Sequence, residues 1–139
     1  MTTNTEVDAY EVVESAWPYD GPHDAYNVAQ AALATSQLIR YLSNATMKRG
    51  TLQYAANAGA IIGHLSSAVA RLPHLLNQLD DFVTRQAEDP SLYDDRRDRP
   101  GAHTAIEVSE VLRSVREPLG RLIDLLNEAA QLSDHLGND

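Results

Sequence analysis

The chain has 139 residues, which is enough for one domain of ordinary size and too few for two. Its 11 Lys and Arg against 20 Asp and Glu give a formal net charge of −9, which argues against nucleic acid or an anionic membrane as the main partner. The sequence contains no cysteine, so disulfides, thiolate metal sites and cysteine nucleophiles are excluded.

Residues 1–22 form an acidic, aromatic arm that contains no Lys or Arg. We expect Trp17, Pro18 and Tyr19 to dock on the helices or on a partner, and the first five residues to be mobile. The N-terminus has neither the basic residues nor the apolar run of a signal peptide, so the expected compartment is the cytoplasm. Export without a leader stays open.

The rest of the chain, residues 23–139, is predicted to be a single all-α domain with helices at about 23–49, 51–88 and 104–136 and a charged loop at 89–103. In each helix, apolar or small side chains recur at alternating intervals of four and three, which places them on one face. The predicted stripes are Val28, Ala32, Thr35, Ile39, Leu42 and Thr46; Ala58, Ile62, Leu65, Val69, Leu72, Leu76, Leu79 and Val83; and Val108, Leu112, Val115, Leu119, Leu122, Leu126 and Ala129.

The helix ends carry residues that commonly cap helices. Asp20 or Gly21 is expected to cap the first helix, and Gly50 to end it in the left-handed conformation. Thr51 is the expected N-cap of the second helix. A capping box of Thr104 and Glu107 is expected to start the third helix.

Long helices with such stripes predict an elongated antiparallel three-helix bundle with coiled-coil-like packing. Pro73 and Pro118 lie inside the stripes, so we expect each to kink its helix rather than divide it. Further apolar residues widen the apolar faces, which favours a homodimer; alternatively, the first helix and the arm cover the excess. These residues are Ile61, Leu75, Phe82, Ile123, Leu125 and Leu132.

The loop alternates acidic and basic residues between two prolines. Arg96, Arg97 and Arg99 could bind an anion or a partner. The interleaved Asp residues cancel most of their field, however, so a solvated loop is the favoured interpretation.

No catalytic, cofactor or metal site is predicted, because none of the five histidines belongs to a known metal motif. Glu107 and Glu110 have the spacing of a magnesium-binding acidic pair, but the second helix offers only the adjacent Asp80 and Asp81. His103 and Glu107 are four apart, yet His103 is expected to precede the helix.

Two segments carry a resemblance: Arg40-Tyr-Leu-Ser-Asn-Ala-Thr46 and Leu72-Pro-His-Leu-Leu-Asn-Gln-Leu79. Together with the helical last third, they resemble short uncharacterised all-helical proteins of high-GC actinobacteria. The resemblance covers about residues 25–136. It implies no activity, so no catalytic residue is transferred from that family.

The expected function is a non-enzymatic helical interaction or assembly module, whose partner is another protein, a second copy, or both; neither nucleic acid nor membrane is expected as a partner. The alternative is a small-molecule-binding bundle that acts as a sensor, with a cavity opened by the kinks and by Gly59, Gly63 and Gly120; a metal-dependent hydrolase ranks third. The candidate interaction residues are Trp17, Tyr19, Arg96, Arg97, Arg99, Ile61, Leu75, Ile123 and Leu125.

Overall fold

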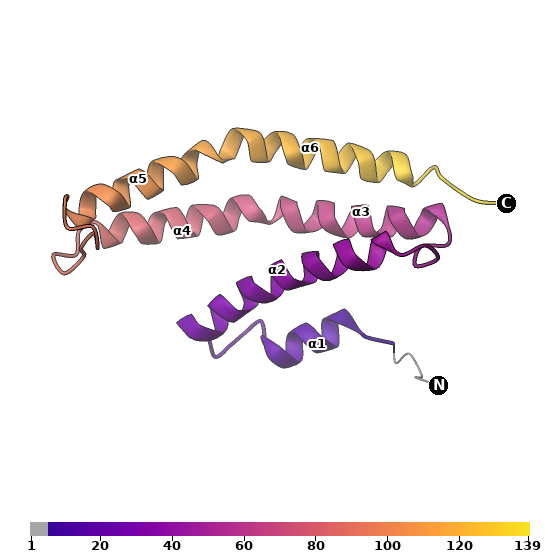
Figure 1. Cartoon of the computed structure of the whole chain (residues 1–139), viewed down its shortest axis with the longest axis horizontal. Coiled ribbons are helices and arrows are strands. Elements are labelled where there is room, and N and C mark those ends of the chain that lie inside the picture. Colours follow the sequence, from indigo (N-terminus) through magenta and orange to yellow (C-terminus); the bar gives the residue numbers. More distant parts are fainter. Residues whose placement is uncertain (1–5) are drawn as a thin grey trace. The chain divides into compact units, whose positions relative to one another are not determined.

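The computed structural model describes residues 6–139, and within them the regular structure is all α-helical, as predicted (Figure 1). None of the helices in this part of the chain has both the length and the apolar character needed to cross a membrane. The helices are α1 (Ala9–Ala16), α2 (Ala25–Met47), α3 (Ala55–Ala70), α4 (Leu72–Gln86), α5 (Gly101–Ser114) and α6 (Arg116–Ser133).

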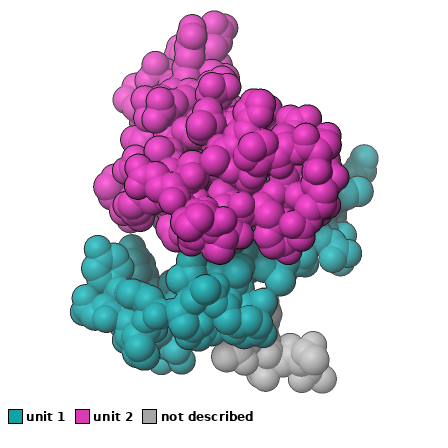
Figure 2. Space-filling view, turned by 90° about the vertical axis from the view of Figure 1, so that its left-hand side faces the viewer, with its two compact units in different colours: residues 1–51 teal, residues 52–139 magenta. Residues whose placement is uncertain are grey.

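The chain divides into two compact units, residues 1–51 and residues 52–139 (Figure 2). The boundary falls between the helices expected at 23–49 and 51–88, although the sequence predicts a single domain over residues 23–139. Residues 48–54 are not helical, and Gly50 has the positive φ (89°) predicted for it. The second helix begins later than the expected cap at Thr51, because Asn57 Oδ1 accepts hydrogen bonds from the N–H groups of Gln53 and Tyr54.

The first unit contains α1 and α2, so part of the expected arm is helical. Asp8 caps α1 by accepting the Glu11 N–H at 3.1 Å. The helix expected at 23–49 spans Ala25–Met47 because its N-cap is Asp24, which accepts the Asn27 N–H at 2.8 Å, and not Asp20 or Gly21. The mobility expected for the first five residues concerns a segment outside the described part of the chain.

In the second unit, each of the two long helices is bent at one residue near its proline, as predicted. Arg71 separates α3 from α4, and Val115 separates α5 from α6. At both points a tighter turn replaces the α-helical bond: the Arg71 N–H donates to Ala68 O and the Val115 N–H to Leu112 O, both at 3.2 Å. A proline lacks the N–H that would bond four residues back, so the bend follows from the sequence.

The two bent helices form an antiparallel hairpin in which α3 packs on α6 and α4 on α5 (Figure 1). We call α3–α4 the first rod and α5–α6 the second rod. The positions that face the other rod form two rows on each rod, and within each row they recur every seven residues. On the first rod they are Ala55, Gly59, Ile62, Ser66, Val69, Pro73, Leu76, Asp80, Val83 and Ala87, and on the second rod Ala105, Ser109, Leu112, Leu119, Ile123, Leu126, Ala130 and Ser133.

The packed stripe shares only one row with each predicted stripe. Ile62, Val69, Leu76 and Val83 are half-buried, but the second packed row of the first rod contains Gly59, Ser66, Pro73 and Asp80 instead of the predicted leucines. Small and polar residues let the two rods approach closely; a Cβ added at Gly59 would lie 3.2 Å from Ser133 Oγ. The predicted leucine row is therefore displaced from the contact between the rods.

This packing leaves the second unit with little buried apolar volume. Among the described residues, only Ala105 and Leu119 are hydrophobic and buried. A domain normally has one contiguous apolar core, whereas the other large apolar side chains of this unit are half-buried or exposed.

Candidate interaction surface

Ten large apolar side chains on the helices of the hairpin are exposed; Ile106 is set apart from the other nine, each of which is between 37% and 66% exposed. Because helical side chains seven residues apart lie on one row, they occupy two neighbouring rows on each rod. They are Leu72, Leu75, Leu79 and Phe82 on the first rod, and Val108, Val111, Leu122, Leu125 and Leu132 on the second.

The apolar rows of both rods lie on the same side of the hairpin. On the first rod the apolar rows lie beside the packed row that contains Ile62, and on the second rod beside the packed row that contains Leu112. In both rods the rotation about the helix axis from the packed row to the apolar rows has the same sense. The rods are antiparallel and face each other, so equal rotation turns both sets of rows toward one face. We call the surface of these nine side chains the apolar face.

Cross-rod contacts fix the register of this face. An Arg116 guanidinium N–H donates to Asn77 Oδ1 at 3.0 Å, and the Thr84 hydroxyl lies 3.4 Å from that of Ser109. This register brings Val108 and Val111 level with Phe82. The apolar side chains of the two rods therefore form one continuous strip, which is what marks interaction surfaces on small proteins.

A buried polar cluster lies between the rods. Asp80, only 3% exposed, accepts hydrogen bonds from the Ser109 hydroxyl, from Arg113 Nε at 3.0 Å and from the Thr84 hydroxyl at 3.3 Å. The Ser109 hydrogen bond, followed by that of Arg113, lowers the pKa of the Asp80 carboxyl below its ordinary value. A satisfied charge of this kind specifies the register of the two rods.

The loop between the rods is organised by Asp94, which is 6% exposed. Its carboxylate accepts from the Arg96 backbone N–H and Nε, both at 2.9 Å, from a terminal guanidinium N–H of Arg96 at 2.6 Å, and from the Thr104 hydroxyl. The paired guanidinium holds the pKa of Asp94 well below its usual range. Thr104 is thus used by the loop, and α5 begins at Gly101, three residues before the expected start.

Gly101 explains the early start of α5. Residue 101 is buried, and a Cβ there would lie 2.7 Å from the carbonyl carbon and oxygen of Leu92 and from the Tyr93 nitrogen. Only glycine lets the two backbone segments approach this closely. The close approach brings Tyr93 and Pro100 together in an isolated β-bridge, which closes the base of the loop.

The three loop arginines proposed as anion ligands all have partners within the loop or α5. Arg96 pairs with Asp94, and Arg97, at φ 60°, stacks its guanidinium 4.0 Å from the centre of the Tyr93 ring. Arg99 pairs with Glu107 at 3.1 Å and with Asp98 at 3.3 Å. These contacts order the loop and reduce its capacity to bind an external anion.

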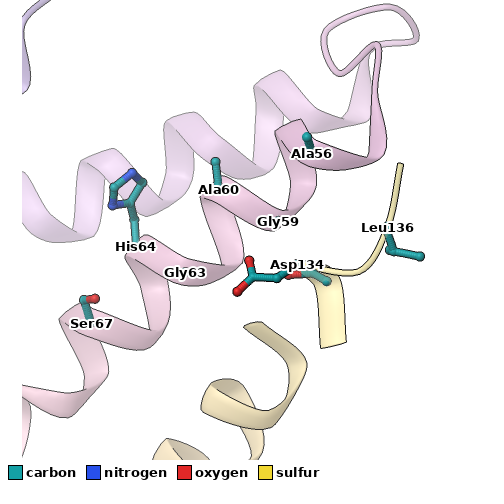
Figure 3. Close-up of a pocket in the computed structure, with 9 residues that line it drawn as sticks. Ala56, Gly59, Ala60, Gly63, His64, Ser67, Asp134 and Leu136 are labelled. Carbon is teal, nitrogen blue, oxygen red and sulfur yellow. The ribbon is translucent and has the colours of Figure 1, made fainter. Parts of the chain in front are cut away.

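An open pocket of about 530 Å³ lies at the other end of the hairpin, beside α3. Figure 3 shows its residues along α3, with Asp134 and Leu136 contributed by the segment after α6. Gly59 and Gly63 leave the space, while His64, Ser67 and Asp134 supply polar groups. A smaller pocket of about 250 Å³ between the rods is lined by Pro73 and Gly120 among others, so the glycines noted in the sequence do border hollows.

The predicted arm residues have different environments. The half-buried Trp17 donates its indole N–H to Asn27 O at 3.1 Å and so ties the segment after α1 to α2 of the same unit. Tyr19 is 87% exposed, and its backbone N–H donates to Glu14 at 3.3 Å.

The predicted apolar residues divide between the two sides of the rods. Leu75 and Leu125 belong to the apolar face, at 48% and 51% exposure, and Ile61 is half-buried on the same row as Leu75. Ile123 lies instead in the packed stripe between the rods. The cluster of Asp80 was not predicted as such, although an acidic residue on a packed heptad row was a signal that could have revealed it.

Within residues 6–139 no group of three or more His, Asp or Glu side chains is placed to hold a metal ion. Asp80 is held by Ser109 and Arg113, whereas Glu107 pairs with Arg99 and lies 3.6 Å from His103 Nε2. Comparisons with protein-family models, with curated proteins and with solved structures each found no match.

Proposed function

We propose that this protein is a non-enzymatic helical interaction or assembly module that associates with protein through the apolar face, with a homodimer as its expected form. The observation that carries the proposal is the unequal distribution of apolar side chains in the hairpin. Two hydrophobic residues are buried, while nine large ones remain exposed on a single strip. Such a strip favours a protein partner over nucleic acid or membrane, in keeping with the net charge of −9.

Two adjacent substitutions test this proposal. Leu79→Glu places a charge in the apolar face, whereas Gln78→Glu adds the same charge one residue away, outside the face, on the polar row that borders it. We expect light scattering after size exclusion to give twice the 15.3 kDa chain mass for the unmodified protein and for Gln78→Glu, and the single-chain mass for Leu79→Glu. A monomeric unmodified protein, or equal behaviour of the two variants, would contradict the proposal.

A small-molecule sensor is the second candidate, supported by the pocket of about 530 Å³ beside α3. Such volumes suit ordinary ligands, although this pocket is open to solvent. Gly63→Leu would fill it, since nothing lies within 4 Å of a Cβ at that position. A metabolite that raises the melting temperature of the unmodified protein and not that of Gly63→Leu would support this function; no shift across a metabolite panel would count against it.

Several finer expectations belong with this proposal. The three-helix arrangement, the cytoplasmic location and membership of the actinobacterial family stay predictions from the sequence. Family membership would be tested by genomic neighbours shared with those proteins.

A further inference from the structure

We propose that the occupant of the apolar face is a second copy of this chain, related by a two-fold axis parallel to the rods. In this dimer the first rod of each hairpin packs antiparallel on the second rod of the other, which gives a four-helix bundle. The inference rests on the proposed function, because it names the partner and geometry of the same surface.

The small buried core of the hairpin favours a partner that is always present, and a second copy of the chain meets this condition. Among the described residues, only Ala105 and Leu119 are buried hydrophobic side chains, and the other large apolar side chains of the hairpin are half-buried or exposed, which is a small core for a unit of this size. Interfaces of obligate dimers are about as hydrophobic as the core of a domain, and the apolar face has this hydrophobic character. A second copy is the one protein always present at equal concentration.

The charges beside the apolar face select the orientation of the axis. The row that borders it on the first rod carries His64, Arg71, Gln78 and Arg85, and the corresponding row of the second rod carries Glu107, Ser114, Arg121 and Glu128. Arg85 has no ion-pair partner within the described part of the chain.

With the axis parallel to the rods, the first-rod border meets the second-rod border of the other copy. At each of the two symmetry-related contacts, the register then brings Arg85 level with Glu107, which also pairs with Arg99, and His64 level with Glu128, at the cost of an Arg71–Arg121 approach. With the axis across the rods, equal borders meet antiparallel, so the basic border of the first rod faces a second basic border and Glu107 faces Glu128. Because opposite charges across an interface favour one orientation of the partners, the axis parallel to the rods is preferred.

Because the chain contains no cysteine, introduced cysteines report this geometry without background. Leu72→Cys and Leu122→Cys, made in separate full-length chains, are mixed under conditions that exchange subunits and then oxidised. We expect a disulfide-linked dimer from the mixture and none from either variant alone, since a disulfide needs Cα atoms within about 7 Å. Gln78→Cys mixed with Leu122→Cys serves as the control that should not cross-link.

The outcomes separate the inference from the proposed function. A covalent dimer from Leu72→Cys alone would show that equal rods meet, and would overturn the orientation while leaving the proposed function intact. The orientation is also overturned if light scattering gives a dimer that Leu79→Glu disrupts but the mixture does not cross-link. A monomeric unmodified chain would overturn both.

Discussion

Asp80 shows how a single buried charge sets the pairing of the two rods. Its carboxylate joins residues from α4 and α5, and the two donors from α5, Ser109 and Arg113, depend on the register of the helices, whereas Thr84 lies on α4 with Asp80. Sliding one rod by a turn would leave the carboxylate unpaired in a buried site, which is costly. Leucine rows alone would tolerate such a slip, because one leucine replaces another.

Asp80→Asn should therefore lower the melting temperature more than Asp81→Asn, which makes the same chemical change at the exposed neighbouring position. The asparagine keeps its size and can still accept from Ser109, but it loses the charge that Arg113 binds. Thermal unfolding followed by circular dichroism measures the difference. Equal melting temperatures for the two variants would show that the cluster does not stabilise the hairpin.

The stabilising effect of the Asp80 carboxylate should also depend on pH. The folded state lowers the pKa of Asp80 below 3.8, so its stabilising effect is complete above that pH and is lost as the pH falls through the folded value. We expect the gap between the unmodified protein and Asp80→Asn to be constant near neutral pH and to close only in acid below 3.8. A gap that closed around neutral pH would assign the effect to a different group.

At the scale of the elements, glycine and proline decide where helices start and bend. Pro73 and Pro118 remove backbone donors inside long helices, and the rods bend within a few residues of each. Gly101 instead permits the contact between the start of α5 and the backbone of Leu92 and Tyr93. The loop closes around that contact, so the geometry of Asp94 and its partners depends on the absence of a side chain at position 101.

Two glycine substitutions should consequently change stability in opposite directions. Gly101→Ala places a Cβ 2.7 Å from backbone atoms and should destabilise the protein by about 1–3 kcal/mol. Gly120→Ala, within α6, meets nothing within 4 Å and should stabilise it by about 0.5–1 kcal/mol through helix propensity. Urea unfolding monitors both; stabilisation by Gly101→Ala would refute the close-approach explanation.

At the scale of the whole molecule, the contrast is between a surface of net charge −9 and an uncovered apolar face. Charge repulsion opposes nonspecific aggregation of a protein with such a net charge, whereas in the proposed dimer burial of the face would drive specific association. If the proposed dimer forms, folding and association should be coupled, because few hydrophobic side chains of the hairpin are buried within it.

The melting temperature should accordingly rise with protein concentration, since dimerisation stabilises the folded state by mass action. We expect this rise over a hundredfold dilution series of the unmodified protein and of Gln78→Glu, measured by thermal unfolding. Leu79→Glu should melt at a lower temperature that does not depend on concentration. A concentration-independent melting temperature in all three proteins would argue against association.

The sequence by itself determined the helices and their bends, because seven-residue periodicity and proline act through neighbours along the chain. It also indicated the excess of apolar surface at Leu75 and Leu125. Only the tertiary structure decided which row is buried: contact between the rods favours the small and polar row of Gly59, Ser66 and Asp80, since small residues allow close approach and Asp80 finds its partners there. Periodicity along the sequence shows which row of a helix is the most hydrophobic, but it contains no information on contacts between distant helices. For this reason the sequence placed Ile123 outside the packed stripe and the row of Leu65, Leu72 and Leu79 inside it.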